Sequence, residues 1–245
     1  MKRKIFLLIL SCLFVFSISC NFTTNPCSTI KEKNLKETLR IDFDSLIEKN
    51  EIKGANLCQV IIKRGEGFNI FYVYPDGKTF IFGEIYKDGI FLSKAATERL
   101  YEKVFQNLKT EIDKIVAFSY TPEGANKYIY MITDPDCPFC EKAKYAIKQW
   151  ADSRKVEVKV IFLPLEKIHP YAKDKAVKAI CHGMNYEDYL NSKWEGQKCD
   201  EGIKKIEDSI AFMQKIYINA TPSFVSFNGK RVTGFSPEGL DSIIK

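Results

Sequence analysis

The hydrophobic and polar positions of residues 43–85 predict a short helix followed by a small antiparallel sheet. The helix is expected at 43–49, and strands are expected at 57–63, 68–74 and 78–85. Gly65-Glu66-Gly67 and Pro75-Asp76-Gly77 mark the turns between these strands. A unit of fewer than about 70 residues with few covering helices has a thin core, so a second copy of the chain could supply the missing burial.

A longer amphipathic helix is predicted at 93–113. Leu100, Val104 and Leu108 recur every four residues along one face, and Ser93 is the expected N-cap. The helix can pack inside one domain or connect the sheet unit to the residues that follow, and the pattern leaves both possibilities open.

The remaining pattern, from about residue 111, predicts a β-α-β half, a helical insertion and a β-β-α half. The expected strands and helices are, in order, strand 127–132, a helix from Cys137, strand 156–162, helices 170–181 and 202–218, strands 224–227 and 231–233, and a last helix opened by Ser236-Pro237-Glu238. Asn228-Gly229 favours a two-residue type I′ turn between the last two strands. This order of elements is the thioredoxin-like architecture.

The first 19 residues have the pattern of an export signal. Lys2-Arg3-Lys4 precedes an apolar run at 5–18 that is too short for a comfortable membrane span. The run ends at Ser17-Ile18-Ser19, where a signal peptidase could cut. Cleavage there removes three positive charges and lowers the formal net charge from +6 to +3, which gives no argument for nucleic acid as a partner. We expect an oxidising compartment, where disulfides persist. Alternatively, Cys20 is the lipidated first residue of a lipoprotein, although Ser17 stands where such signals usually have an aliphatic residue.

The strongest chemical signal is Cys137-Pro138-Phe139-Cys140, which follows an apolar strand directly. A cysteine in the first turn of a helix meets unpaired N–H groups and the positive end of the helix dipole, which lower its pKa. Cys137 is therefore the predicted nucleophile, and Cys140, three positions on, is within reach to resolve a mixed disulfide. Taken alone, the motif also fits a structural disulfide or half of a zinc site.

A zinc site lacks an obvious second half in this sequence. His169 and His182 are the only histidines, and neither stands at metal-finger spacing from the two cysteines. We expect no metal and no organic cofactor, and we expect both histidines to be solvated residues at helix ends.

The dipeptide Thr221-Pro222 precedes the predicted strand 224–227. Proline lacks a donor for the sheet ladder, so it belongs at a strand entry or in a special turn. In thioredoxin-like domains, a cis proline at this junction lies against the redox pair and leaves a backbone edge free for an extended peptide. The alternative is an ordinary trans proline in a loop, but the position relative to Cys137 favours the cis form.

These features together resemble the bacterial periplasmic disulfide isomerases of the DsbC/DsbG type. The C-P-F-C motif, the helical insertion with Cys181 and Cys199, Thr221-Pro222-Ser223 and the tail at 229–240 are similar to that family's catalytic domain. The preceding sheet and helix resemble its dimerisation domain and linker. The resemblance covers nearly the whole mature chain.

The resemblance implies a mixed α+β and α/β fold with four parts. These are a signal peptide at 1–19, an N-terminal antiparallel-sheet dimerisation domain at 20–92, a linker helix at 93–110, and a thioredoxin-like catalytic domain at 111–245 with an insertion at about 165–218. It also implies a homodimer whose active sites face a cleft for misfolded, disulfide-containing exported proteins. A membrane thiol electron donor of the DsbD type would keep these sites reduced.

The resemblance also implies a role for each residue of its motifs. Cys137 would attack and Cys140 would resolve, while Thr221, Pro222, Pro138 and Phe139 would contact the substrate. Cys181 and Cys199 would form a structural disulfide. Cys27 and Cys58 can form a further bridge, although a buried free Cys58 is as plausible.

Two departures from the family pattern bear on the chemistry. Pro138-Phe139 replaces the Gly-Tyr of the best-known isomerases, which leaves open whether the site isomerises, reduces or oxidises. Asp134 and Asp136 add negative charge that would oppose thiolate formation if it lies close. The sequence thus predicts a periplasmic thiol-disulfide oxidoreductase acting mainly as an isomerase. The alternatives are a dedicated reductase or oxidase for one client, and a dimeric peptide-binding chaperone that acts as a holdase.

Overall fold

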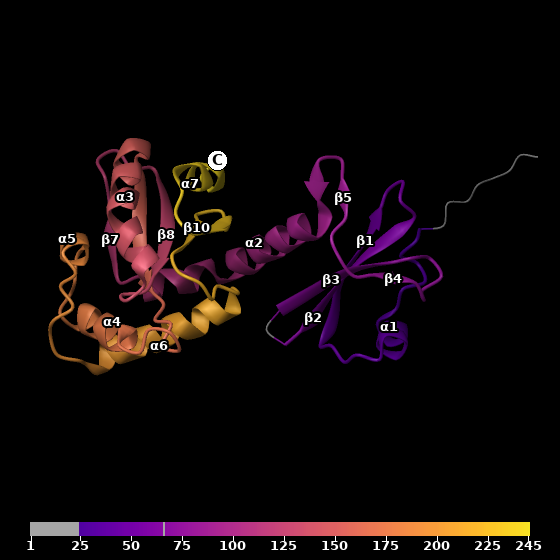
Figure 1. Cartoon of the computed structure of the whole chain (residues 1–245), viewed down its shortest axis with the longest axis horizontal. Helices are drawn as coiled ribbons and strands as arrows, with labels where there is room; N and C mark the ends of the chain where they lie inside the picture. Colours follow the sequence, from indigo (N-terminus) through magenta and orange to yellow (C-terminus); the bar gives the residue numbers. More distant parts are fainter. Residues whose placement is uncertain (1–24, 66) are drawn as a thin grey trace, which may run out of the picture.

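The described part of the chain has two larger sheets, one at each end of a long helix. The structure is a computed structural model and describes residues 25–65 and 67–245. A four-stranded sheet lies at the N-terminal end, a five-stranded sheet lies at the C-terminal end, and α2 (Leu92–Ile112) runs between them (Figure 1). The predicted fold class, an N-terminal antiparallel sheet followed by a thioredoxin-like part with a helical insertion, is confirmed.

The N-terminal sheet has the order β1-β2-β3-β4, with antiparallel pairing throughout. Its strands are β1 (Ser45–Ile52), β2 (Leu57–Arg64), β3 (Gly67–Val73) and β4 (Phe80–Ile81), and a short hairpin of β5 (Tyr86–Lys87) and β6 (Ile90–Phe91) follows. The central strand β2 is buried from Leu57 to Ile62, so it forms the middle of this core.

The expected helix at 43–49 is wrong, because this segment forms most of β1. Ser45 pairs with Lys63 and Ile52 pairs with Leu57, so the segment gains a full ladder against the buried strand β2. Tertiary pairing of this kind overrides a weak local helix preference. The helix of this region is α1 (Glu32–Leu39), which lies upstream and buries Leu35. The strand expected at 78–85 is reduced to the two residues of β4.

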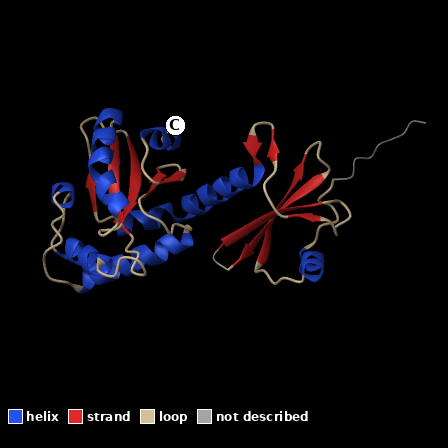
Figure 2. Ribbon diagram, viewed as in Figure 1, coloured by secondary structure: helices blue, strands red, loops and turns tan. Residues whose placement is uncertain are grey.

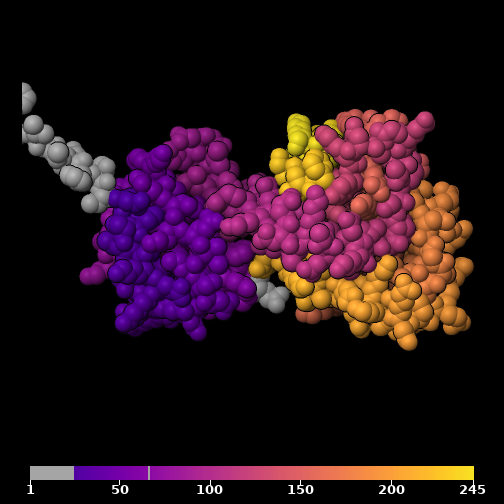
Figure 3. All heavy atoms as spheres, turned by 180° about the vertical axis from the view of Figure 1, so that it is seen from behind, coloured from indigo at the N-terminus to yellow at the C-terminus, as the bar shows by residue number. Residues whose placement is uncertain are grey.

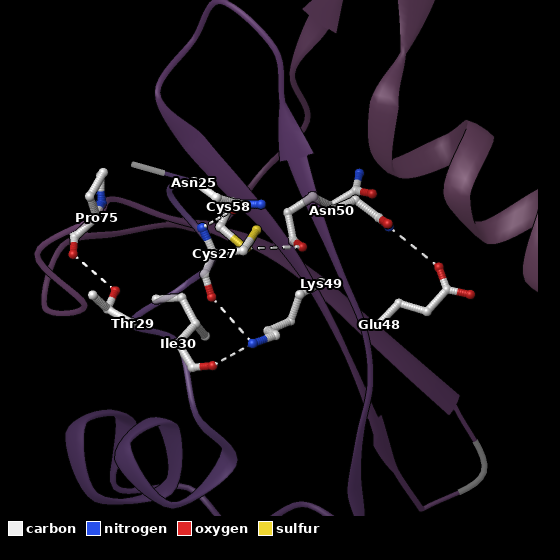
Figure 4. Close-up of a disulfide and its surroundings, with 10 residues drawn as sticks. Asn25, Cys27, Thr29, Ile30, Glu48, Lys49, Asn50, Cys58 and Pro75 are labelled. Carbon is white, nitrogen blue, oxygen red and sulfur yellow. Dashed lines mark hydrogen bonds between the residues drawn. A yellow bond between two sulfur atoms is a disulfide. The ribbon is translucent and has the colours of Figure 1, made fainter. Parts of the chain in front are cut away.

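A disulfide between Cys27 and Cys58 ties the segment before α1 to β2. The two Cα atoms are 5.0 Å apart, and both side chains are buried. Figure 4 shows Lys49 of β1 beside this bridge, where its Nζ donates to the carbonyl oxygens of Cys27 at 3.2 Å and Ile30 at 2.8 Å. Of the two states that the sequence left open for Cys58, the structure has the bridged one.

The N-terminus of α2 is capped by a carboxylate from the preceding loop. Phe91 occupies the N-cap position and Ser93 lies inside the first turn, so the expected cap at Ser93 is wrong. The Glu84 carboxylate accepts hydrogen bonds from Ser93 N at 2.6 Å and Lys94 N at 3.2 Å. A carboxylate at this position satisfies orphan donors and suits the helix dipole.

The other end of α2 belongs to the C-terminal core. Phe105 and Ile112 are buried there with Tyr130 and Ile132 of the second sheet. Between the two ends, the Tyr101 ring contacts Tyr217, and the Arg231 guanidinium lies 3.3 Å from the Tyr101 ring centroid. The helix also packs against the N-terminal sheet, because Ala96 and Leu100 are buried with Ile61 of β2. It therefore connects the two parts and contributes to the core of each; seen from behind, the two parts lie side by side along it (Figure 3).

The C-terminal sheet has the order β11-β10-β8-β9-β7. Its strands are β7 (Phe118–Tyr120), β8 (Lys127–Thr133), β9 (Val156–Phe162), β10 (Ser223–Ser226) and β11 (Arg231–Thr233), and only β8 and β9 pair in parallel. One face packs against α3 (Pro138–Arg154) and α7 (Pro237–Ile243), and the other packs against α2 and α6 (Asp200–Lys215) (Figure 2). The three-residue edge strand β7 was not predicted.

The helical insertion contains α4 (Ala172–Cys181), α5 (Tyr186–Leu190) and α6. A disulfide joins Cys181, at the end of α4, to Cys199, the N-cap of α6, with 5.7 Å between the Cα atoms. In the chain-entropy model, a bridge that closes a loop of this length stabilises by about 3 kcal/mol. Within the described residues, no helix has the length and apolar character needed to cross a membrane.

Candidate active site

The C-P-F-C motif lies where β8 passes into α3. Cys137 is the N-cap of α3, and Pro138 takes the first helical position, where its missing N–H is not needed. Cys137 N donates to the Asp134 carbonyl oxygen at 3.2 Å, and Glu141 N donates to the Cys137 carbonyl oxygen at 3.0 Å. Cys137 thus sits at the N-terminal, positive end of the helix dipole of α3.

Both thiols are free and buried, and the loop before β10 lies against them. Cys137 is 5% exposed and Cys140 is 1% exposed. The Thr221-Pro222 bond is cis, and the Cys137 Sγ atom lies 3.5 Å from the Thr221 carbonyl oxygen. The structure therefore brings Cys137, Cys140 and Thr221-Pro222 together from segments more than 80 positions apart, with a separation of 84 between Cys137 and Thr221.

The second thiol is held in its protonated form. Burial raises the pKa of Cys140 to about 12, and the neighbouring Cys137 thiol acts in the same direction. The Asp134 backbone and the hydroxyls of Thr133 and Thr221 stabilise the Cys140 thiolate and offset part of this rise. At neutral pH, Cys140 is therefore a poor nucleophile until its surroundings change.

The two carboxylates beside the motif each have a partner. Asp134 is buried, and its Oδ2 atom lies 3.0 Å from His169 Nδ1; Asp136 forms an ion pair with Lys175 of α4. The Asp136 carboxylate thus has the Lys175 ammonium as its counter-charge, and the Asp134 carboxylate has a hydrogen-bond partner in His169. The expectation that His169 is solvated is wrong. The loop before α4 turns this side chain towards Asp134, and it is only 17% exposed. His182 is exposed at the end of α4, as expected.

A second buried polar group lies behind Cys140 and was not predicted. The Thr133 hydroxyl is 2.8 Å from the Tyr189 hydroxyl, and burial raises the pKa of Tyr189 well above its ordinary value. Lys144 is fully buried; its Nζ donates to Ser192 Oγ at 2.7 Å and pairs with Glu141 at 2.6 Å. The only sequence signal was the position of Lys144, one helical turn after Cys140 on the same face of α3.

Three large apolar side chains around the redox turn are exposed. Phe139 is 68% exposed, Ile168 is 67% exposed and Tyr171 is 73% exposed. Ile168 and Tyr171 belong to the loop that contacts Asp134 through Leu165 N and His169. The motif is thus bordered by apolar surface. Among the described residues, no group of three or more His, Cys, Asp or Glu side chains is arranged to hold a metal ion.

Residues 116–244 match the model of the thioredoxin-like domain family, and the chain belongs to that family. The more particular likeness is to thiol:disulfide interchange protein DsbG. The Pseudomonas aeruginosa protein of that name is 26% identical over 110 residues, which cover 44% of this chain and 43% of the relative. The Escherichia coli (strain K12) protein is 24% identical over 161 residues, which cover 62% and 65%. The chain thus spans less than two thirds of the length of these relatives.

The chain is also similar to the solved structures of Helicobacter pylori DsbG and a disulfide interchange protein from Neisseria gonorrhoeae. The first is 16% identical, with a TM-score of 0.38 over 80% of this chain and 100% of that chain. The second is 22% identical, with a TM-score of 0.42 over 51% of this chain and 91% of that chain. The predicted resemblance to proteins of the DsbG type is confirmed.

Proposed function

We propose that this protein is a thiol-disulfide oxidoreductase that isomerises or reduces wrong disulfides in exported proteins. The observation that carries the proposal is the asymmetry of the two free thiols. Cys137 lies at the N-terminus of α3 against the cis Thr221-Pro222 bond, whereas burial raises the pKa of Cys140 to about 12. The relatives named as thiol:disulfide interchange proteins support this reading.

The proposed reaction begins with the Cys137 thiolate. It attacks one sulfur of a client disulfide, a Cys137–client disulfide forms, and the other client sulfur leaves as a thiolate. If a client thiolate then attacks the mixed disulfide, Cys137 is regenerated, and the client is isomerised with no net electron transfer. If Cys140 loses its proton and attacks Cys137 instead, a Cys137–Cys140 disulfide forms, and the client departs with two more electrons. A membrane thiol donor of the DsbD type would then have to restore the dithiol.

Client contact is proposed for Pro138, Phe139, Thr221 and Pro222. Phe139 projects into solvent next to Cys137, and the exposed side chains of Ile168 and Tyr171 extend this apolar border. Misfolded chains expose apolar side chains around their cysteines, and such a border suits them. No metal or organic cofactor is needed for the exchange steps.

We also propose the domain organisation and the homodimer that the sequence predicted. The parts are a dimerisation domain at 20–92, a linker helix at 93–110 and a catalytic domain at 111–245. Exposed Phe82, Tyr86, Ile90 and Phe91 on the N-terminal part support a partner copy. Light scattering at micromolar concentration is expected to give the mass of two chains, and the mass of one chain would contradict the dimer.

A periplasmic location is proposed from the two disulfides, which persist in oxidising compartments. The signal peptide at 1–19 and the lipidation of Cys20 lie outside the described residues and stay proposals.

Reactivation of scrambled ribonuclease in glutathione-poor buffer tests the function. We expect the wild-type protein to restore ribonuclease activity and Cys137→Ala to lose this ability. Cys140→Ala separates the two routes, because an isomerase keeps much of its activity without the resolving thiol and a reductase does not. Suppressed aggregation with no reactivation, equal in wild type and Cys137→Ala, would instead support the holdase.

A further inference from the structure

A buried contact between a histidine and a carboxylate lies next to the redox turn. The Asp134 carboxylate accepts hydrogen bonds from Asp136 N at 2.7 Å and Leu165 N at 2.7 Å. His169 Nδ1 lies 3.0 Å from the same Oδ2 atom that Leu165 contacts. Asp134 is 1% exposed, so these three groups replace the water that a carboxylate otherwise binds.

Asp134 holds the turn that leads into Cys137 in two ways. Its carbonyl oxygen accepts from Cys137 N at 3.2 Å, and its carboxylate accepts from Asp136 N within the same turn. A shift of the Asp134 side chain would therefore move the backbone at Cys137. The position of the Cys137 sulfur against the N-terminus of α3 depends on this backbone.

The loop after β9 positions His169 beside the Asp134 carboxylate. His169 N donates to the Leu165 carbonyl oxygen at 2.9 Å, which folds the loop back, and Ala172 N donates to the His169 carbonyl oxygen at 3.1 Å, which joins it to α4. One turn into α4, Lys175 pairs with Asp136. The same segment thus supplies a partner for each acidic residue before Cys137.

We propose that His169 is a positioning residue for Cys137: its Nδ1 donates to Asp134 and so fixes the redox turn. The proposal rests on the proposed redox role of Cys137. A histidine that donates from Nδ1 keeps this hydrogen bond in its neutral and its protonated form, so protonation alters the charge and leaves the geometry in place.

The other charged and titratable groups around His169 and Asp134 are the same in wild type and in the variants that test the proposal. They are the Asp136–Lys175 pair, the two thiols of α3, and Glu166 and Lys167, which precede His169 in its own loop.

The test is the rate at which iodoacetamide alkylates Cys137 in the reduced full chain, followed from about pH 5 to about pH 9, the range in which histidine titrates. Mass spectrometry assigns the adduct to Cys137. The variants are His169→Asn, whose amide nitrogen occupies the place of Nδ1 without its charge, and His169→Ala, which removes the donor. His182→Asn is the matched control, because His182 is the other histidine of the chain and is exposed.

The wild-type profile is the reference for all three variants. His169→Ala is expected to move the profile to higher pH and to lower the rate near pH 7 by about threefold or more, equivalent to half a pH unit. His169→Asn is expected to keep the wild-type profile, because its amide nitrogen donates to Asp134 in place of Nδ1. His182→Asn is expected to overlay the wild type.

Two results would overturn the positioning role. One is a folded His169→Ala protein with the wild-type profile, and the other is a His169→Asn protein that behaves as His169→Ala does. If His169→Ala does not fold, His169→Leu, which also lacks a donor, replaces it: a rate near pH 7 lowered by about threefold or more supports the proposal, and the wild-type rate contradicts it. Alkylation requires no client, so failure here would leave the oxidoreductase proposal standing.

Discussion

Cys140 keeps its proton because it is enclosed by protein. It is 1% exposed, and burial raises its pKa to about 12, although the Thr133 and Thr221 hydroxyls favour the thiolate. Cys137, three residues earlier, lies at the N-terminus of α3, at the positive end of the helix dipole. The order of events in the proposed reaction therefore follows from where each sulfur lies.

The raised pKa of Cys140 predicts a loss of stability of the reduced protein at high pH. The folded protein binds this proton more tightly than the unfolded chain, whose thiol has a pKa of 9.0, so the stabilisation is present below pH 9 and is lost as the pH rises towards 12. Between pH 8 and pH 10, the loss is expected to be about 1 kcal/mol.

Urea unfolding of the reduced protein measures this loss, with reduced Cys140→Ala as the control. The variant lacks the titrating thiol and retains every other group. An equal change in the free energy of unfolding for both proteins between these two pH values would contradict the assignment to Cys140.

Single residues differ in how far the sequence reveals their roles. The spacing of Cys137 and Cys140 is local, so both were predictable as the reactive pair. The partners of His169, Lys144 and Thr133 lie 35, 45 and 56 positions away in the sequence. No periodicity records such contacts, because they arise only when the insertion packs against α3 and β8.

At the scale of elements, the sequence predicted helices and strands correctly where a regular hydrophobic pattern was followed by residues that end a helix or strand. Strands β2, β8 and β9 and helices α2 and α3 were predicted close to their observed bounds. The segment Ser45–Ile52 was predicted as partly helical because its pairing with β2 is a tertiary effect. Strand β7 was missed, since three residues carry too little pattern.

In the hairpin of β10 and β11, Asn228-Gly229 predicted the position of the turn correctly but not its type. Gly229 has φ +89°, while Asn228 does not have a positive φ, so the type I′ prediction is wrong. Ser226 N donates to the Lys230 carbonyl oxygen and Gly229 N donates to the Ser226 carbonyl oxygen, which defines a three-residue loop ending in a left-handed glycine. The Asn228 carboxamide oxygen accepts from Ser226 Oγ and Lys230 N, which holds Asn228 in place.

This loop also packs closely against α2, so we expect Gly229→Ala to lower the free energy of unfolding. A Cβ atom at Gly229 would lie 2.9 Å from the Phe105 ring and 3.3 Å from the Glu102 backbone, and φ +89° is itself unfavourable for alanine. We expect a loss of about 2–4 kcal/mol, from about 1 kcal/mol of backbone strain and about 1–3 kcal/mol of overpacking.

Gly234→Ala is the matched control for this variant. Gly234 has φ +79° and an alanine Cβ there meets no atom within 4 Å, so only the backbone strain remains. Thermal or urea unfolding compares the two. Equal losses in both variants would show that the contact of the hairpin with α2 contributes nothing.

At the scale of the whole molecule, α2 connects the part that holds the thiol pair to the N-terminal sheet. Phe68 of that sheet contacts Tyr217, with ring centroids 5.2 Å apart, and Tyr217 lies four residues before Thr221 of the redox site. The N-terminal part is therefore in direct contact with the segment that leads to the cis proline. In the proposed homodimer, this arrangement would set where the two thiol pairs face their client.

The central claim, that Cys137 attacks and Cys140 resolves, is tested most directly by trapping the mixed disulfide. A reduced Cys140→Ser protein is mixed with an unfolded, disulfide-containing client, and mass spectrometry locates the bond. The account predicts a stable adduct on Cys137 that wild type does not accumulate, because Cys140 releases it, and no adduct in Cys137→Ser. An adduct on Cys140 in Cys137→Ser that forms as fast as the one on Cys137 would contradict the account.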